Sequence, residues 1–185
     1  MRTVSSLSLL LLLVAAATAQ DRLLSPYQPQ AQSGLRGLNE NEIAELRAGA
    51  GMGLARAAEL NSYPGPRHVL DAVAAGRLQA SPAQVQQVRL TFDGMKGDAQ
   101  RIGAEILKEE ERLEATFRAG TITDPDLRLR VTRIAALQGE LRAIHLRAHV
   151  ATRAMLSAAQ LARYNELRGY TTGSVDHPPG QPHMH

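Results

Sequence analysis

Two long runs of apolar residues, spaced alternately three and four positions apart, constrain the fold more than any other feature of the sequence. The first run covers residues 82–119 and the second covers residues 125–155. Such spacing places apolar side chains on one face of an α-helix, and over this length it is typical of helices that pack side by side. The link at 120–124 is short, so we expect the two helices to run antiparallel. The expected apolar faces consist of Val85, Val88, Phe92, Met95, Ala99, Ile102, Ile106, Leu113 and Phe117 in the first run, and of Ile134, Leu137, Leu141, Ile144, Ala148, Ala151 and Met155 in the second.

Composition supports an all-α domain. The chain has 185 residues, enough for one domain, and Ala, Leu, Arg, Gln and Glu outnumber Val, Ile and Thr, which favours helix over strand. The absence of Cys excludes disulfide scaffolds, Cys-ligated zinc and thiol catalysis. The net charge is only +3 and aromatic residues make up 3% of the chain, which argues against nucleic-acid binding.

The N-terminus has the pattern of a secretory signal peptide at residues 1–19. Arg2 precedes an apolar block that is too short to span a bilayer, and Ala17-Thr18-Ala19 resembles a cleavage site. Residues 20–38 form an expected flexible leader. No later stretch is long and apolar enough to span a membrane. We therefore expect an exported, soluble protein that is not membrane-embedded, periplasmic if the source is a Gram-negative bacterium.

An all-helical domain is expected over residues 39–169. Its first helix is expected from Asn39 or Asn41 to about Leu60, with three interior glycines that require support from neighbours or leave it partly frayed. A type II turn is expected at Pro64-Gly65, with a positive φ at Gly65, and it leads to a short helix at 67–75. The tail at 170–185 has no apolar period, so we expect it to be disordered.

Helix ends are marked by capping residues. Ser81-Pro82-Ala83-Gln84 and Ser157-Ala158-Ala159-Gln160 both have the capping-box pattern, in which the serine and the glutamine bond each other's backbone N–H. Asp124 is the expected N-cap of the second long helix. Gly120 is expected to end the first long helix in the left-handed conformation, and Gly169 is expected to stop the last helix.

Charges are expected to support the hairpin. Five acidic residues crowd the end of the first long helix and three arginines crowd the start of the second, so folding brings opposite charges together. These residues are Glu105, Glu109, Glu110, Glu111, Glu114, Arg128, Arg130 and Arg133. A hairpin of this length leaves an apolar stripe for the short helices or a second subunit to cover, and we expect a homodimer.

Histidines are the candidate metal ligands. His145 and His149 lie four residues apart on one helix face, and His177, His183 and His185 lie in the tail. Neutral imidazole binds Zn²⁺, Cu²⁺ or Ni²⁺. The alternative for the helical pair is an ordinary packed role, because two ligands are too few for a tight site. Leu146 excludes the zinc-protease pattern, and the sequence has no nucleophile elbow or phosphate loop, so we expect no enzyme.

Arginines along the second long helix are the candidate surface for a client or partner. A basic, partly apolar surface attracts unfolded chains by charge and then buries their apolar segments. The alternative is a surface that only promotes solubility. The candidates are Arg128, Arg133, Arg142, Arg147 and Arg153.

The two capping boxes resemble the paired L-T-x-x-Q motifs of the Spy/CpxP-like periplasmic family. The residues that match are Ser81 and Gln84 in the first copy, and Leu156, Ser157 and Gln160 in the second. Serine replaces threonine in both copies, and alanine replaces leucine at position 80. The resemblance covers about residues 50–170 and implies a small all-helical protein, often a cradle-shaped dimer, whose motif residues are structural.

This resemblance implies a function in envelope stress. Family members act as ATP-independent holdase chaperones, as inhibitors of envelope-stress sensors, or as heavy-metal sensors and resistance proteins. We therefore expect a periplasmic holdase that binds partly unfolded envelope proteins and requires no cofactor. The alternatives are a Zn-, Cu- or Ni-binding protein that uses its histidines, and an adaptor that docks onto a membrane sensor protein.

Overall fold

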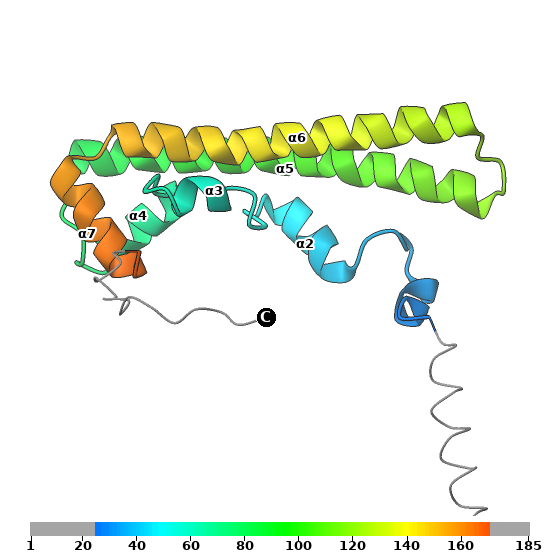
Figure 1. The fold of residues 1–185 in the computed structure, drawn as a ribbon, viewed down its shortest axis with the longest axis horizontal. Coiled ribbons are helices and arrows are strands. Elements are labelled where there is room, and N and C mark those ends of the chain that lie inside the picture. Colours follow the sequence, from blue (N-terminus) through cyan, green and yellow to red (C-terminus); the bar gives the residue numbers. More distant parts are fainter. Residues whose placement is uncertain (1–24, 171–185) are drawn as a thin grey trace, which may run out of the picture. The chain divides into compact units, whose positions relative to one another are not determined.

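The computed structural model describes residues 25–170 (Figure 1). The expected signal peptide, the first residues of the leader and the tail after Tyr170 lie outside the described residues. The chain divides into two units, residues 1–39 and 40–185. The described part of the first unit contains a short 3-10 helix, η1 (Gln28–Gln32), and the described part of the second contains six α-helices. No strand occurs within residues 25–170, which confirms the all-α class.

Two long helices form the predicted hairpin. They are α5 (Pro82–Arg118) and α6 (Asp124–Ala154), and they lie side by side over most of their length (Figure 1). Their facing residues are buried as the spacing predicted, with Ile102 and Leu137 each 1% exposed. Both boundaries of α5 fall within one residue of the expected ones.

Phe117 is wrongly placed in the predicted core, because its side chain is 53% exposed. The pairing of Glu105 with Arg133 shows the antiparallel register, which places Phe117 opposite the link before α6. The apolar run of α6 begins only at Ile134. The last turn of α5 therefore has no apolar partner across the hairpin.

The predicted ion pairs across the hairpin form only in part. Arg133 Nη2 lies 3.0 Å from Glu105 Oε2, which joins the two helices. Arg128, in contrast, pairs with Asp124 in its own helix at 2.7 Å. These groups are largely exposed, so each pair contributes about 0–1 kcal/mol to stability.

The first predicted helix of the domain is wrong in its extent. In place of one helix to Leu60, the chain forms α2 (Glu40–Ala48) and α3 (Arg56–Glu59). Gly49 and Gly53 have φ values of +64° and +72° and Met52 has +46°. This left-handed backbone ends a right-handed helix, and glycine adopts it at little cost.

Helix α2 crosses α5 very closely at Gly103. A Cβ on Gly103 would overlap the carbonyl oxygen of Leu46 and would lie 2.9 Å from its carbonyl carbon. The glycine in the middle of α5 therefore serves as the contact point for α2.

Two shorter helices pack at the base of the hairpin, where α5 begins and α6 ends. They are α4 (Pro66–Ala74) and α7 (Ala158–Arg168), both close to the predicted bounds. A buried cluster joins them to the hairpin, and it consists of Val69, Leu70, Leu78, Val88, Leu156 and Tyr164.

Both predicted capping boxes are confirmed, at Ser81 with Gln84 and at Ser157 with Gln160. The two glutamine amides also bond each other across the base, with Nε2 to Oε1 distances of 3.1 and 3.2 Å. Each amide additionally donates to a main-chain carbonyl next to the other motif: Gln84 to Met155 and Gln160 to Gln79. The two capping motifs thus also bind each other and join the start of α5 to the start of α7.

The N-cap of α6 differs from the prediction. Thr123 occupies this position, and its hydroxyl accepts from the backbone N–H of Asp126 at 3.4 Å. Asp124 is instead the first helical residue, where its charge pairs with Arg128 and suits the positive end of the helix dipole. Across the described stretch of the chain, no helix is long and apolar enough to cross a membrane.

Candidate functional site

A cavity of about 340 Å³ lies where the loop after α2 and the first turn of α4 meet the two long helices. Three histidines and two cationic residues line it, and the lining contains no Asp or Glu. The remaining wall is small or apolar. The lining residues are Ala48, Gly49, Ala50, Gly51, Gly65, Pro66, Arg67, His68, Phe92, Met95, Lys96, His145 and His149.

His145 lines this cavity and has a buried ring nitrogen without a hydrogen-bond partner. Its side chain belongs to a residue that is 3% exposed, and its Nε2 has no hydrogen-bond partner. Burial lowers the pKa of His145, the nearby His149 lowers it further, and a hydrogen bond to the backbone of Ala50 only partly opposes them. The ring is therefore neutral at neutral pH. Because Nε2 has no partner, we assign the hydrogen bond with the Ala50 backbone to Nδ1, which leaves the lone pair on Nε2.

His149 is oriented in the same way. Its Nδ1 lies 2.7 Å from the carbonyl oxygen of Tyr63. A carbonyl oxygen only accepts, so Nδ1 carries a proton, and in the neutral form of the ring Nε2 holds the lone pair. A Cβ on Gly65 would lie 3.1 Å from this Nε2 and 3.5 Å from His68 Nδ1. Because Gly65 has no side chain, the space between the imidazoles of His149 and His68 stays open.

Behind the histidines lies a buried carboxylate, Glu59, whose residue is 9% exposed. Its Oε1 accepts from the hydroxyl of Tyr164 at 2.5 Å, from the hydroxyl of Tyr170 at 3.2 Å and from Arg168 Nε at 3.2 Å. Its Oε2 accepts from the backbone N–H of Gly65 at 3.2 Å. Glu59 thus ties α3 to the start of α4 and to α7.

The pKa of Glu59 is set by opposing effects. Burial raises it, but hydrogen bonds from His68 and Tyr164 and the charges of His68 and Arg168 outweigh burial and lower the pKa to about 2. The carboxyl is therefore ionised at neutral pH. Burial and the hydrogen bond to Glu59 raise the pKa of the Tyr164 phenol. The phenol therefore stays protonated and donates this hydrogen bond to Glu59.

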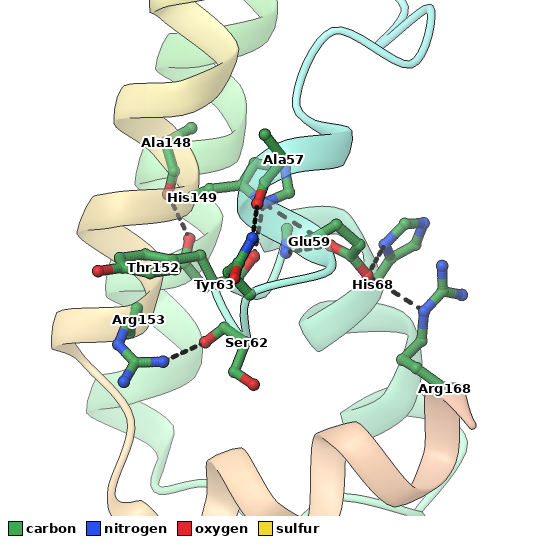
Figure 2. A network of polar contacts seen from close by, with 12 residues as sticks. Ala57, Glu59, Ser62, Tyr63, His68, Ala148, His149, Thr152, Arg153 and Arg168 are labelled. Carbon is green, nitrogen blue, oxygen red and sulfur yellow. Dashed lines mark hydrogen bonds and ion pairs between the residues drawn. The ribbon is translucent and has the colours of Figure 1, made fainter. Parts of the chain in front are cut away.

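The Glu59 carboxylate also lies beside two of the cavity histidines, as Figure 2 shows. Its oxygens are 3.5 Å from His68 Nδ1 and 3.6 Å from His149 Nδ1. The negative charge of Glu59 therefore favours a proton on Nδ1 of His149. A carboxylate behind the proton-bearing nitrogen fixes the ring and makes its other nitrogen a better electron donor.

The loop before α4 is clamped to α6. Arg153 donates to the carbonyl oxygen of Ser62, and its guanidinium lies 4.6 Å above the ring of Tyr63 (Figure 2). This clamp places the Tyr63 carbonyl under His149. Arg153, a candidate for client binding by sequence, therefore has a structural contact.

The other predicted arginines differ in their contacts. Arg128 and Arg133 are engaged in ion pairs, as described above. Arg142 and Arg147 are exposed on α6. Arg147 borders a separate groove of about 220 Å³ with Asp98 and Met95.

The start of α4 forms part of the cavity wall. Its N-cap is Gly65, which supplies no side-chain cap, and Pro66, Arg67 and His68 of its first turn line the cavity. Backbone N–H groups at a helix start lack intrahelical partners and carry a partial positive charge. At this helix start Pro66 has no N–H and the N–H of Gly65 donates to Glu59, so the Glu59 carboxylate offsets the positive end of the helix.

The structure brings His145 and His149 together, as the spacing predicted, and adds His68. His177, His183 and His185 lie outside the described residues. Within residues 25–170, no three His, Cys, Asp or Glu side chains are arranged to hold a metal ion. The described protein therefore offers two imidazole nitrogens, and further ligands have to come from elsewhere.

Several residues of the site were missed by sequence reasoning. Glu59 follows two alanines in a short polar-apolar stretch, and no pattern there indicates a buried carboxylate. Lys96 and Met95 lie on the long helix without any motif. The predicted type II turn at Pro64-Gly65 is wrong, because Gly65 has φ −74° and is the N-cap of α4. The proximity of Gly65 to His149 depends on a contact between distant segments.

The sequence matches no family model, and it has no significant match among curated proteins or solved structures.

Proposed function

We propose that this protein is a non-enzymatic metal-binding protein that holds a divalent transition metal ion through Nε2 of His145 and His149. The observation that carries this proposal is that His145, whose buried Nε2 has no hydrogen-bond partner, lines one cavity together with His149. A buried polar atom without a partner is costly, so its presence needs a reason. Both rings bond backbone groups through Nδ1, the arrangement typical of metal-bound histidine.

The donor set favours Zn²⁺, Cu²⁺ or Ni²⁺, the ions that imidazole suits. A closed structural zinc site has four protein ligands, whereas this cavity offers two. Such a site supports reversible binding, as in a sensor or a scavenger. His68, a tail histidine or a second protomer can supply a further ligand.

Metal binding is expected to depend on the cavity pair. In a variant with His177, His183 and His185 replaced by alanine, we expect calorimetric titration to show micromolar or tighter binding of at least one of the three ions. Adding His145→Ala and His149→Ala is expected to weaken that binding at least tenfold, which corresponds to ~1.4 kcal/mol. Because protons compete for the same nitrogens, affinity is expected to fall as the pH drops below neutral.

A control separates loss of ligands from loss of structure. Gly65→Ala fills the space beside His149, and its φ of −74° and ψ of 139° suit alanine. We expect this variant to stay folded by circular dichroism and to lose metal affinity. Affinity that survives the loss of both cavity histidines would contradict the proposal.

We also propose that the protein is exported to the periplasm and belongs to the Spy/CpxP-like group as a homodimer. The signal-peptide pattern at 1–19 supports export. The two capping boxes that join at the base of a long hairpin support the family. An adaptor that docks onto a membrane sensor is compatible with the same fold and a metal-sensing site.

A holdase is the second candidate function, favoured by the far end of the hairpin. This end extends beyond α2 (Figure 1). Large apolar side chains are exposed on segments of α5 and α6 that also contain arginines. They are Phe117, Leu129 and Val131. Basic groups around apolar side chains suit the capture of partly unfolded proteins.

The holdase candidate predicts that this end suppresses aggregation. Replacing Phe117, Leu129 and Val131 by serine is expected to remove at least half of the suppression measured by light scattering with a denatured client protein. Leu90→Ser is the control, since Leu90 is equally exposed but lies on α5 away from this end. Equal suppression by the triple variant and the control would argue against the holdase.

A further inference from the structure

We infer that the same cavity is a binding site for a small uncharged aromatic molecule, with Met95 as its adjustable wall. This inference goes beyond the proposed metal function and requires no metal ion. Four properties of the cavity lead to it. They are its size, the planar groups in its wall, the balance of charge around it and the position of Met95 between two neighbouring spaces.

The size of the cavity suits a small organic molecule. Its volume of about 340 Å³ lies at the lower end of the range for small-molecule sites, roughly 300–1,000 Å³. Eight of the 13 residues that line it are Ala, Gly, Pro, Phe or Met, so much of the wall consists of carbon and backbone atoms. An apolar ligand that enters this space leaves water and is stabilised by the hydrophobic effect.

The wall also contains groups that pack well against aromatic rings. Phe92 is partly exposed, and the guanidinium of Arg67 lies 5.9 Å from the centre of its ring. The three lining imidazoles are planar as well. Aromatic rings stack on each other and on guanidinium groups, and a thioether sulfur such as that of Met95 makes favourable contacts with rings. A flat aromatic ligand therefore matches this wall better than a branched aliphatic one.

The charges around the cavity are largely balanced. Arg67 pairs with Asp71 at 2.9 Å. The Glu59 carboxylate lies 3.5 and 3.6 Å from Nδ1 of two lining histidines. Lys96 is exposed, so water solvates its charge. A charged ligand would lose its hydration here without gaining a buried partner of opposite sign, whereas an uncharged ligand avoids this cost.

Met95 separates the cavity from the groove of about 220 Å³, because it lines both. Adjacent residues of each long helix line different spaces: Phe92 and His149 line the cavity, whereas Thr91 and Ala148 line the groove. Consecutive helix positions point about 100° apart, so the two spaces lie on different sides of the α5–α6 contact. The Met95 side chain is unbranched and adaptable. Its movement toward the groove is expected to lengthen the cavity.

Two probes with the same ring system test the charge of the ligand. We would titrate the full chain, with EDTA present, into 1-naphthol and into 1-naphthoate and follow the fluorescence at neutral pH. The first probe is uncharged under these conditions and the second is an anion. We expect 1-naphthol to bind with a dissociation constant of about 100 µM or lower, and at least tenfold more tightly than 1-naphthoate. Absent binding of 1-naphthol, or equal binding of the two probes, would overturn the inference.

Two phenylalanine variants locate the probe. Phe92→Leu keeps an apolar side chain but removes the ring from the cavity wall, and it is expected to weaken 1-naphthol binding at least threefold. Phe117→Leu is the matched control, since Phe117 lies on the same helix, is 53% exposed and is outside the cavity lining. Equal effects of the two variants, or a larger effect of Phe117→Leu, would remove the site from this cavity.

A longer probe tests the role of Met95. N-phenyl-1-naphthylamine is uncharged and has one ring more than 1-naphthol. Met95→Ala is expected to bind it at least threefold more tightly than the wild type does, because the shorter side chain joins the cavity to the groove. Met52→Ala is the control, since Met52 is 37% exposed and lines neither space. Unchanged or weaker binding by Met95→Ala would show that Met95 is not an adjustable wall.

The failures of this inference and of the metal proposal are distinguishable. EDTA removes divalent metal ions, so the naphthol titration succeeds or fails independently of the metal site. Binding of 1-naphthol without any binding of metal ions retains the aromatic site and removes the metal function. Metal binding that depends on His145 and His149, without binding of 1-naphthol, does the reverse.

Discussion

Glu59→Gln is expected to lower the free energy of unfolding by about 3 kcal/mol at pH 7. A depression of the Glu59 pKa from 4.5 to about 2 corresponds to this amount at ~1.4 kcal/mol per unit. The amide keeps the shape of the side chain but removes the charge that faces Arg168 and turns a donor toward some of the surrounding N–H and O–H groups. Urea unfolding of the two proteins at pH 7 measures the difference.

The same carboxylate predicts a pH dependence of definite sign. Because the folded-state pKa of Glu59 lies below the unfolded value, its contribution to stability is complete above about pH 4.5. This contribution is lost as the pH falls toward 2. The stabilities of wild type and Glu59→Gln are therefore expected to converge between pH 4.5 and 2.

Glu105→Gln is the control for the Glu59 prediction. Glu105 also pairs with arginine, but its side chain is 40% exposed, so the expected loss is below about 1 kcal/mol. Equal losses at the two positions, or a Glu59→Gln difference that persists unchanged to pH 2, would show that the buried cluster does not stabilise the fold through its charge.

Gly103→Ala is expected to release α2 from the hairpin. The added Cβ meets the backbone of Leu46, which cannot move aside as a flexible side chain does. Overpacking of this kind costs about 1–3 kcal/mol, which exceeds the gain of about 1 kcal/mol from alanine in a helix. We expect lower thermal stability and faster amide hydrogen exchange in residues 43–50.

Gly97→Ala provides the opposite result on the same helix. A Cβ there has no neighbour within 4 Å, so only the helix propensity changes and stability is expected to rise by up to about 1 kcal/mol. The pair isolates the contact with α2 from the general effect of glycine. If both variants shift stability in the same direction, the close crossing does not hold α2.

The hairpin could be predicted from the sequence because its information is local and repeated. The apolar spacing of α5 and α6, the capping serines and the left-handed glycines each specify structure within a few residues. The split between α2 and α3 was harder, since the three glycines predicted weakness without saying where the backbone turns left-handed. Phe117 matched the periodic pattern, but burial also needs a partner on the opposite helix.

The site was predictable only in its local part. The spacing of His145 and His149 is a property of one helix, and it correctly placed two rings on one face. The bonds that orient the rings come from Ala50 and Tyr63, about 90 residues away in the chain. Glu59 is ordinary in sequence and becomes exceptional only when Tyr164 and Arg168 of α7 surround it.

The joint between Gln84 and Gln160 has a consequence for how the length of this protein can change. The two amides fix the base of the hairpin, where α4 and α7 also pack, so the register of α5 against α6 is set from that end. The opposite end carries a short loop and no further helix of the domain (Figure 1). Seven residues added to each arm beside that loop would preserve the apolar seam and leave the cavity untouched. Insertions and deletions beside this loop can therefore change the lengths of α5 and α6 without changing the cavity.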